Sequence, residues 1–222
     1  MLSKVIAIDG PSASGKGTLA SNIARELGWA TLDSGSIYRA IGLLAGRLGL
    51  LDQESELVLK LRDFDLRFEN GSCFLADEDL TQEIRTEEVG KMASAIASFP
   101  SLRETVLNLQ RDFRRPPGLV ADGRDIGTIV FPNADLKIFL DASAEARAER
   151  RYNELKNKGF DVSLPVLLEQ LLQRDKKDSE RSVAPLIPAE DSILIDSSGL
   201  SILDVTKSVL DLVKQKGWVE FF

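Results

Sequence analysis

Histidine is absent from this chain of 222 residues, and cysteine occurs once, at Cys73. Without histidine the protein has no imidazole that could act as a general base or ligate a metal ion. A single cysteine forms no disulfide within the chain, which favours the reducing cytoplasm as the location. Long apolar runs are also missing, so we expect no membrane span, and "MLSKVIAI" lacks the length and cleavage site of a secretory signal.

Basic residues are fewer than acidic ones, 28 against 35, which gives a formal net charge of −7. This balance disfavours nucleic acid and membranes as partners, although arginines gathered in one cleft could still bind phosphates. Hydrophobic residues make up 43% of the chain and charged residues 28%, as in ordinary globular proteins. We expect one domain or a core with small insertions, acting as a monomer.

Short apolar, β-branched runs alternate with helical patterns, which predicts an α/β fold with a parallel sheet flanked by helices. The predicted strands are Val5–Ile8, Leu119–Ala121, Leu136–Leu140 and Ile193–Ile195. The predicted helices are Lys16–Leu27, Ile37–Arg47, Thr86–Ala97, Ser101–Phe113, Ala144–Lys158, Pro165–Lys176 and Ser201–Lys216. The segment from Phe64 to Leu80 alternates with period two and predicts an antiparallel hairpin with Asn70-Gly71 in its turn and Cys73 as a small apolar filler.

The stretch "GPSASGKGT", Gly10 to Thr18, lies between the first predicted strand and the first predicted helix. Backbone N–H groups of such a loop converge on an anion, the helix N-terminus adds its dipole, and Lys16 adds a positive charge. We expect Asp9 to help shape this loop. The residue after the lysine is Gly17, where most phosphate loops have a hydroxyl that ligates Mg²⁺, so direct ligation there is not expected. The alternative is a glycine turn before a lysine-started helix.

Two further stretches bear polar groups. In "LDSGSIYRA" we expect Ser34 and Gly35 in a loop, and the hydroxyls of Ser34 and Tyr38 with Arg39 could hold a dianionic phosphate. The alternative is a helix start capped by Ser34 or Ser36 with Arg39 in solvent. In "GLVADGRDIGTIVFP" a strand ends at Asp122, at the sheet edge where α/β proteins bind ligands, and Arg124 and Asp125 follow in a glycine-rich loop.

Two charged runs place arginines at helical spacing. "AEARAERR" puts Arg147, Arg150 and Arg151 on one helical face, and "RDKKDSER" puts Arg174, Asp178 and Arg181 along one side of a helical segment. The alternative is a solvated face paired with neighbouring glutamates.

The motifs "GPSASGKGT", "DSGSIYR" and "ADGRDIGTIVFP", with "EIRTEEVG" and "RSVAPLIPA", resemble the bacterial cytidylate kinases over nearly the whole chain. The resemblance implies a P-loop kinase core (residues 1–62 and 98–222), an insertion that binds the nucleoside monophosphate (about 63–97) and a helical lid (about 160–185). It implies phosphorylation of CMP and dCMP by ATP, with Mg²⁺ carried by the ATP and no metal ligated directly by the protein.

The same resemblance implies roles for individual residues. The catalytic residues would be Lys16, Arg124, Arg151 and Arg181. ATP would contact Gly10, Pro11, Ser12, Ala13, Ser14, Gly15, Lys16, Gly17, Thr18 and Arg150. The CMP phosphate would contact Ser34, Tyr38, Arg39, Arg124 and Arg181, the cytosine Ser94, Arg103 and Asp125, and the ribose Arg174 and Asp178. Lys177 stands where many relatives have arginine, so it is left out of these sets.

Two other classes of function stay open on the residues alone. A P-loop kinase of a hydroxyl acceptor would need a carboxylate base, and Asp33 or Asp122 could serve. A nucleotide-dependent switch protein would usually have Ser or Thr directly after the loop lysine, where this chain has Gly17.

Overall fold

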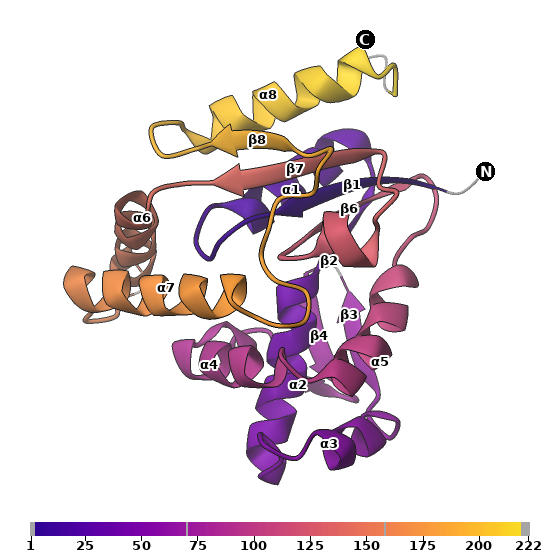
Figure 1. Ribbon diagram of the computed structural model, residues 1–222, viewed down its shortest axis with the longest axis vertical. Coiled ribbons are helices and arrows are strands. Elements are labelled where there is room, and N and C mark those ends of the chain that lie inside the picture. The colour runs from indigo at the N-terminus through magenta and orange to yellow at the C-terminus, as the bar shows by residue number, and fades with distance from the viewer. Residues whose placement is uncertain (1–2, 70, 158, 219–222) are drawn as a thin grey trace. The chain divides into compact units, whose positions relative to one another are not determined.

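The computed structural model describes residues 3–69, 71–157 and 159–218 (Figure 1). The chain divides into two compact units. The first comprises residues 1–31 and 114–222, and the second comprises residues 32–113. The boundaries that the family resemblance implies for the insertion and the lid stay predictions.

A parallel sheet with the strand order β2-β6-β1-β7-β8 forms the centre of the first unit (Figure 1). β1 pairs in parallel with β6 on one side and with β7 on the other. The prediction of an α/β fold is confirmed, and β2, whose first two residues belong to this unit, is the one strand of the sheet that the apolar pattern did not indicate. The strands are β1 (Lys4–Asp9), β2 (Ala30–Asp33), β6 (Gly118–Gly123), β7 (Leu136–Asp141) and β8 (Ile193–Asp196).

The two faces of this sheet contact different elements. Ile6 and Ile8 of β1 are fully buried against α1 (Lys16–Leu27) and α8 (Ile202–Gln215), in a core that β6 and β7 also line. Because strand residues alternate between faces, Asp9 points to the opposite side. There it meets η2 (Ile126–Val130), a π-helical turn that follows β6. The unit also holds α6 (Ala144–Asn157) and α7 (Leu164–Ser179), which pack against each other.

The second unit has its own small core, built on α2 and the predicted hairpin. Cys73 lies buried in this core, as predicted, and burial raises the pKa of its thiol to about 11. Gly71 has a φ of +82°, whereas Asn70 lies outside the described residues. The elements are α2 (Ser34–Leu48), α3 (Glu54–Leu61), β3 (Leu66–Glu69), β4 (Ser72–Leu75), β5 (Glu78–Asp79), η1 (Glu83–Arg85), α4 (Glu87–Ile96) and α5 (Pro100–Arg111).

The start of α2 corrects the sequence prediction. Ser34 and Gly35 do not form a loop, because α2 begins at Ser34 and not at Ile37. The cap is neither Ser34 nor Ser36 but Asp33, whose carboxylate accepts the N–H of Ser36 at 3.0 Å and the hydroxyl of Ser36 at 2.6 Å. A carboxylate before a helix satisfies an N–H that the first turn leaves without a partner, which starts the helix one turn earlier.

Candidate functional site

The loop from Gly10 to Thr18 connects β1 to α1, as the sequence predicts. Gly10 has a φ of +148°, and a Cβ there would lie 2.0 Å from the carbonyl oxygen of Leu140, so no other residue fits. Gly15 and Ala13 also have positive φ, and Gly15 directly precedes the first residue of α1, Lys16. The loop is therefore tightly wound, with the unpaired N–H groups of a helix N-terminus at its end.

Lys16 is buried beneath this loop. Its Nζ donates to the carbonyl oxygen of Pro11 at 2.6 Å and to Oγ of Ser14 at 3.4 Å. Burial, and next the positive charge of Arg124, lower the pKa of Lys16 to about 7, against the opposing effects of Asp122 and Asp9. The nearby carboxylates therefore compensate the charge of Lys16 only in part, and a bound anion would favour its protonated form.

Arg147 braces the loop from α6. It is buried, and it donates to the carbonyl oxygens of Ala142 at 2.9 Å and Ser12 at 3.1 Å. Its third contact is an ion pair at 2.6 Å with Asp175 of α7. The side chain therefore ties the phosphate loop to both α6 and α7.

Arg150 and Arg151 have different surroundings, although both come from the same helical face. Arg150 donates to the carbonyl oxygen of Ser14 at 3.3 Å and to both oxygens of Ser197, a buried residue that directly follows β8. Arg151 pairs with Glu154 at 2.8 Å, the i,i+3 pairing that the solvated-face alternative expected. Both arginines nevertheless line a cavity.

This cavity has a volume of about 490 Å³ and lies beside the phosphate loop within the first unit. Ala13, Ser14, Gly15 and Thr18 of the loop form one part of its lining. The other part comes from α6, the end of β7, the segment between β8 and α8, and the start of α8. The residues are Arg150, Arg151, Glu154, Leu140, Ser197, Leu200, Ser201, Ile202 and Val205. Its size and its mixture of apolar groups with a few polar ones are typical of a small-molecule site.

Arg124 and Asp178 form a second polar centre in the first unit. The guanidinium donates to Oδ2 of Asp178 at 2.8 Å, and most of both side chains is buried. Burial raises the pKa of Asp178, but Arg124, and then Arg181 and Arg174, act more strongly together and leave that pKa below its ordinary value. The four side chains thus lie within electrostatic range of one another.

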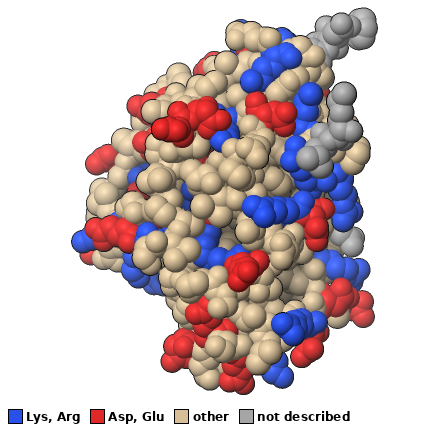
Figure 2. Space-filling view, turned by 45° about the vertical axis from the view of Figure 1, so that its right-hand side comes forward, with Lys and Arg blue, Asp and Glu red and all other residues tan. Residues whose placement is uncertain are grey.

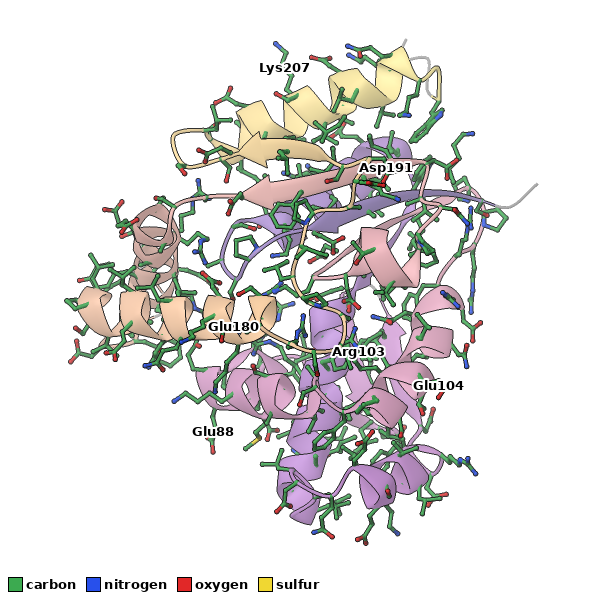
Figure 3. All side chains as sticks on the ribbon, in the orientation of Figure 1. Glu88, Arg103, Glu104, Glu180, Asp191 and Lys207 are labelled. Atoms are coloured by element: carbon green, nitrogen blue, oxygen red, sulfur yellow. The ribbon has the colours of Figure 1, made fainter. Side chains whose placement is uncertain are left out.

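The position of Arg181 corrects one detail of the sequence prediction. α7 ends at Ser179, so Arg181 is not on the same helix as Arg174 and Asp178. It lies in the loop that follows, and its Nε donates to the carbonyl oxygen of Asp178 at 3.3 Å. The helix ends in Asp178 and Ser179, and Glu180, labelled in Figure 3, follows it as the C-cap.

Asp125 lies buried in the first unit, and the remaining predicted residues belong to the second unit. Ser34 is buried and its Oγ accepts from Gln110 at 2.7 Å. Arg39 donates to the carbonyl oxygens of Ile84 at 2.8 Å and Thr86 at 2.9 Å, so it is not simply solvated as one alternative held.

Three predicted residues of this unit come from α2, α4 and α5. The guanidinium of Arg103, labelled in Figure 3, lies 5.6 Å from the ring centroid of the buried Tyr38. Ser94 is half-buried on α4. The structure therefore brings Tyr38 and Arg103 together.

Some residues at these sites were not predicted from the sequence. Gln110 and Ser197 are buried polar residues that contact predicted site residues, but neither lies in a recognisable motif. Arg147 belongs to the arginine run identified in the sequence. Helical spacing alone could not show that Arg147 contacts the phosphate loop at Ser12, whereas Arg151 pairs with Glu154.

Within the described residues, no cluster of three or more Cys, Asp or Glu side chains could hold a metal ion. None of the described helices combines the length and the apolarity needed to cross a membrane. On the face shown in Figure 2, acidic and basic side chains are interspersed.

Comparison with known proteins gives consistent matches. The family model described as cytidylate kinase matches residues 6–215. The cytidylate kinase of Aeromonas hydrophila is 50% identical over 220 residues, covering 97% of this chain and 96% of that protein. The cytidylate kinase of Shewanella baltica is 47% identical over 219 residues, with coverage of 96% and 95%. A crystal structure of an uncharacterized protein from Eubacterium ventriosum shares the fold, with a TM-score of 0.50 at 10% identity and coverage of 95% and 98%.

Proposed function

Because the chain belongs to the cytidylate kinase family, we propose that it transfers the γ-phosphoryl group of ATP to CMP and dCMP, giving ADP with CDP or dCDP. The observation that carries this proposal is the grouping of cations around the phosphate loop. Arg124 and Arg174 are near enough to Lys16 to lower its pKa. The like charges of such a cluster repel one another, and the cluster is suited to the charge of a phosphoryl group in transfer.

The phosphate loop, Gly10 to Thr18, is the proposed site of the ATP phosphates. Its backbone N–H groups and the ammonium of Lys16 would hold the outer phosphates. The neighbouring cavity of about 490 Å³ has the size for the nucleoside part of ATP. Arg150 lines this cavity and also donates a hydrogen bond to the carbonyl oxygen of Ser14 in the loop. Gly17 offers no side-chain oxygen, which supports the entry of Mg²⁺ with ATP; the ion would offset phosphate charge.

For the acceptor, the roles assigned from the sequence stand as proposals. Arg124 and Arg181 would grip its phosphate together with Ser34, Tyr38 and Arg39. Cytosine would be read by Asp125, Ser94 and Arg103, and the ribose would be held by Arg174 and Asp178. The closeness of Arg124, Arg174, Asp178 and Arg181 supports a common role for the four.

The reaction needs little from the protein besides alignment and electrostatics. A phosphate oxygen of CMP is already ionised at neutral pH, so no general base is required, and the absence of histidine is no obstacle. Arg151, Arg181 and Lys16 would stabilise the charge of the moving group. Closure of the α7 region would exclude water, which otherwise would accept the phosphoryl group. We also propose that the protein works as a monomer in the cytoplasm, on CMP, dCMP and ATP without nucleic-acid or membrane partners.

Incubation of the protein with ATP, Mg²⁺ and each nucleoside monophosphate in turn tests the proposal. CMP and dCMP should be phosphorylated in preference to UMP, AMP and GMP. Lys16→Ala should lower turnover by roughly 10²-fold or more while the fold is retained. Wild-type turnover in the folded variant would contradict the assignment of the phosphate loop.

The base preference has its own variant. Cytosine presents an amine where uracil presents a carbonyl, so a carboxylate at Asp125 would accept from CMP and repel UMP. In the wild type, the mismatch between two acceptors should give a CMP-over-UMP ratio of kcat/KM of roughly tenfold to hundredfold. Asp125→Asn should therefore lower this ratio. An equal loss on both substrates, with the ratio unchanged, would show that Asp125 does not read the base.

A further inference from the structure

Asp9 is a buried carboxylate to which the reaction above gives no role. It is the last residue of β1, directly before the phosphate loop, and only 4% of it is exposed. Both of its oxygens accept short hydrogen bonds from backbone N–H groups of η2. Oδ1 accepts from Ile126 at 2.8 Å, and Oδ2 accepts from Gly127 at 2.7 Å.

These two N–H groups are the first of the π-helical turn. The first N–H groups of a helical segment have no acceptor within that segment. An acceptor outside the turn that binds them therefore fixes the position of the turn. Arg124 and Asp125 come immediately before Ile126, and Asp125 is itself buried. The prediction that Asp9 helps to shape the phosphate loop stays a prediction, and the carboxylate itself contacts the turn that follows Arg124 and Asp125.

Gly127 lies close to this carboxylate and to the stem of Lys137. A Cβ at Gly127 would lie 3.4 Å from Oδ2 of Asp9 and 3.2 Å from Cδ of Lys137. The ammonium of Lys137 donates to the carbonyl oxygen of Pro132 and to Asp191 (labelled in Figure 3), so the stem of Lys137 and not its charge lies against Gly127. The turn therefore packs against both the Asp9 carboxylate and the Lys137 stem at Gly127.

We propose that Asp9 is a positioning residue for the acceptor nucleotide: it fixes the turn bearing Arg124 and Asp125 to the strand from which the phosphate loop starts. The inference rests on the proposed function, because Arg124 and Asp125 are there assigned to the acceptor. All of these residues lie in the first unit. Asp9 thereby keeps the acceptor-binding groups at a set spacing from the donor loop, which in-line transfer requires.

The chemistry of the contact requires a carboxylate. An amide has one accepting oxygen, and its NH₂ group would face the second backbone N–H. The buried charge is itself unfavourable: burial raises the pKa of Asp9 to about 6, although the two N–H groups favour the charged form. Asp125 acts in the same direction as burial and Lys16 in the opposite one. A residue needed only for packing would not have to be ionisable.

Two variants and a control test the proposal. Asp9→Asn removes one acceptor. Gly127→Ala leaves the charge at residue 9 unchanged and places a Cβ 3.2 Å from Cδ of Lys137, which requires a shift of the turn or of that stem beside the Asp9 contact. Asp135→Asn is the control, because Asp135 also accepts a backbone N–H of β1, that of Val5 at 2.8 Å, at the other end of the strand. For each variant we would measure kcat/KM for CMP and UMP, and the Kd of an ATP analogue without acceptor.

Asp9→Asn should lower kcat/KM for CMP by roughly 10- to 100-fold, and Gly127→Ala should lower it by a smaller factor of at least about twofold. Both variants should narrow the CMP-over-UMP ratio, while the Kd for the analogue changes by less than about threefold. Asp135→Asn should match the wild type. Unchanged CMP kinetics in folded Asp9→Asn, or an equal loss of affinity for the ATP analogue, would overturn the proposal. If Asp9→Asn does not fold, Gly127→Ala decides by the same criteria.

Arg124→Ala separates this inference from the proposed function. If Arg124→Ala lowers kcat/KM for CMP and Asp9→Asn does not, the inference alone is wrong. If the wild type phosphorylates no nucleoside monophosphate, the proposed function is wrong, and the inference that rests on it is wrong too.

Discussion

Binding of ATP to the phosphate loop should draw protons from solution, because Lys16 is buried beside other cations. Its pKa of about 7 reflects burial first and then the charge of Arg124. The phosphates of ATP would bring negative charge to the ammonium and raise that pKa well above neutrality. A lysine that is partly neutral in the empty protein would therefore be protonated in the complex.

The expected number of protons follows from the shift. With a pKa of about 7 in the free protein, Lys16 would take up about 0.9 proton at pH 8, about 0.5 at pH 7 and about 0.1 at pH 6. Uptake should thus increase with pH over this range, and the affinity for ATP should fall as the pH rises above 7.

Titration calorimetry measures this directly. A non-hydrolysable ATP analogue would be titrated without acceptor in HEPES and in Tris, whose ionisation enthalpies differ, and phosphate buffer would be avoided because it competes for the loop. The slope of the observed enthalpy against the ionisation enthalpy gives the protons taken up. Lys16→Met, which cannot titrate, should abolish the uptake. An uptake below about 0.2 proton at pH 8, or the same uptake in Lys16→Met, would refute the reasoning.

Three further outcomes are expected. Arg181→Ala should lower phosphoryl transfer far more than the affinity for ATP alone, and equal losses in the two would assign Arg181 to the donor site. Arg147→Ala should destabilise the fold by about 3 kcal/mol in urea unfolding, because it leaves Asp175 without its ion-pair partner; a change within experimental error would contradict the bracing role. Asp9 has a folded pKa above its ordinary 3.8, at about 6, so its protonated form favours folding below pH 4, and this advantage is lost as the pH rises through 6. Relative to Asp9→Asn, the wild type should lose about 3 kcal/mol of stability over that range, and a flat difference would contradict the buried charge.

Much of the fold could be predicted from the sequence because most strands of the parallel sheet are short apolar runs. The runs at Val5–Ile8 and Leu136–Leu140 lie within β1 and β7, and α1 begins and ends at the predicted residues. β2 and α3 were missed. β2 is mostly exposed and has no apolar run, and α3 has eight residues with one of them buried, so neither shows a clear period.

The candidate site was predictable where a motif has a fixed backbone geometry. The phosphate loop and Lys16 are of this kind, since strand, loop and helix follow each other directly. The contacts of Asp9 with Ile126 and Gly127 join positions 117 and 118 residues apart, and no local pattern encodes them. Likewise, helical spacing could place Arg147 and Arg151 on one face but could not show which of them reaches the phosphate loop.

The strand order has a consequence for synthesis on the ribosome. β1 is made first, yet it pairs with β6 and β7 on its two sides, and Lys4 is paired with Gly118. At roughly 5–20 residues per second, the nascent β1 waits on the order of ten seconds before its first partner strand exists. During that time the apolar run from Val5 to Ile8 has neither of its neighbouring strands. The second unit, residues 32–113, is continuous in the chain and lies wholly within that interval, so its own core can form before the sheet that flanks it in the sequence.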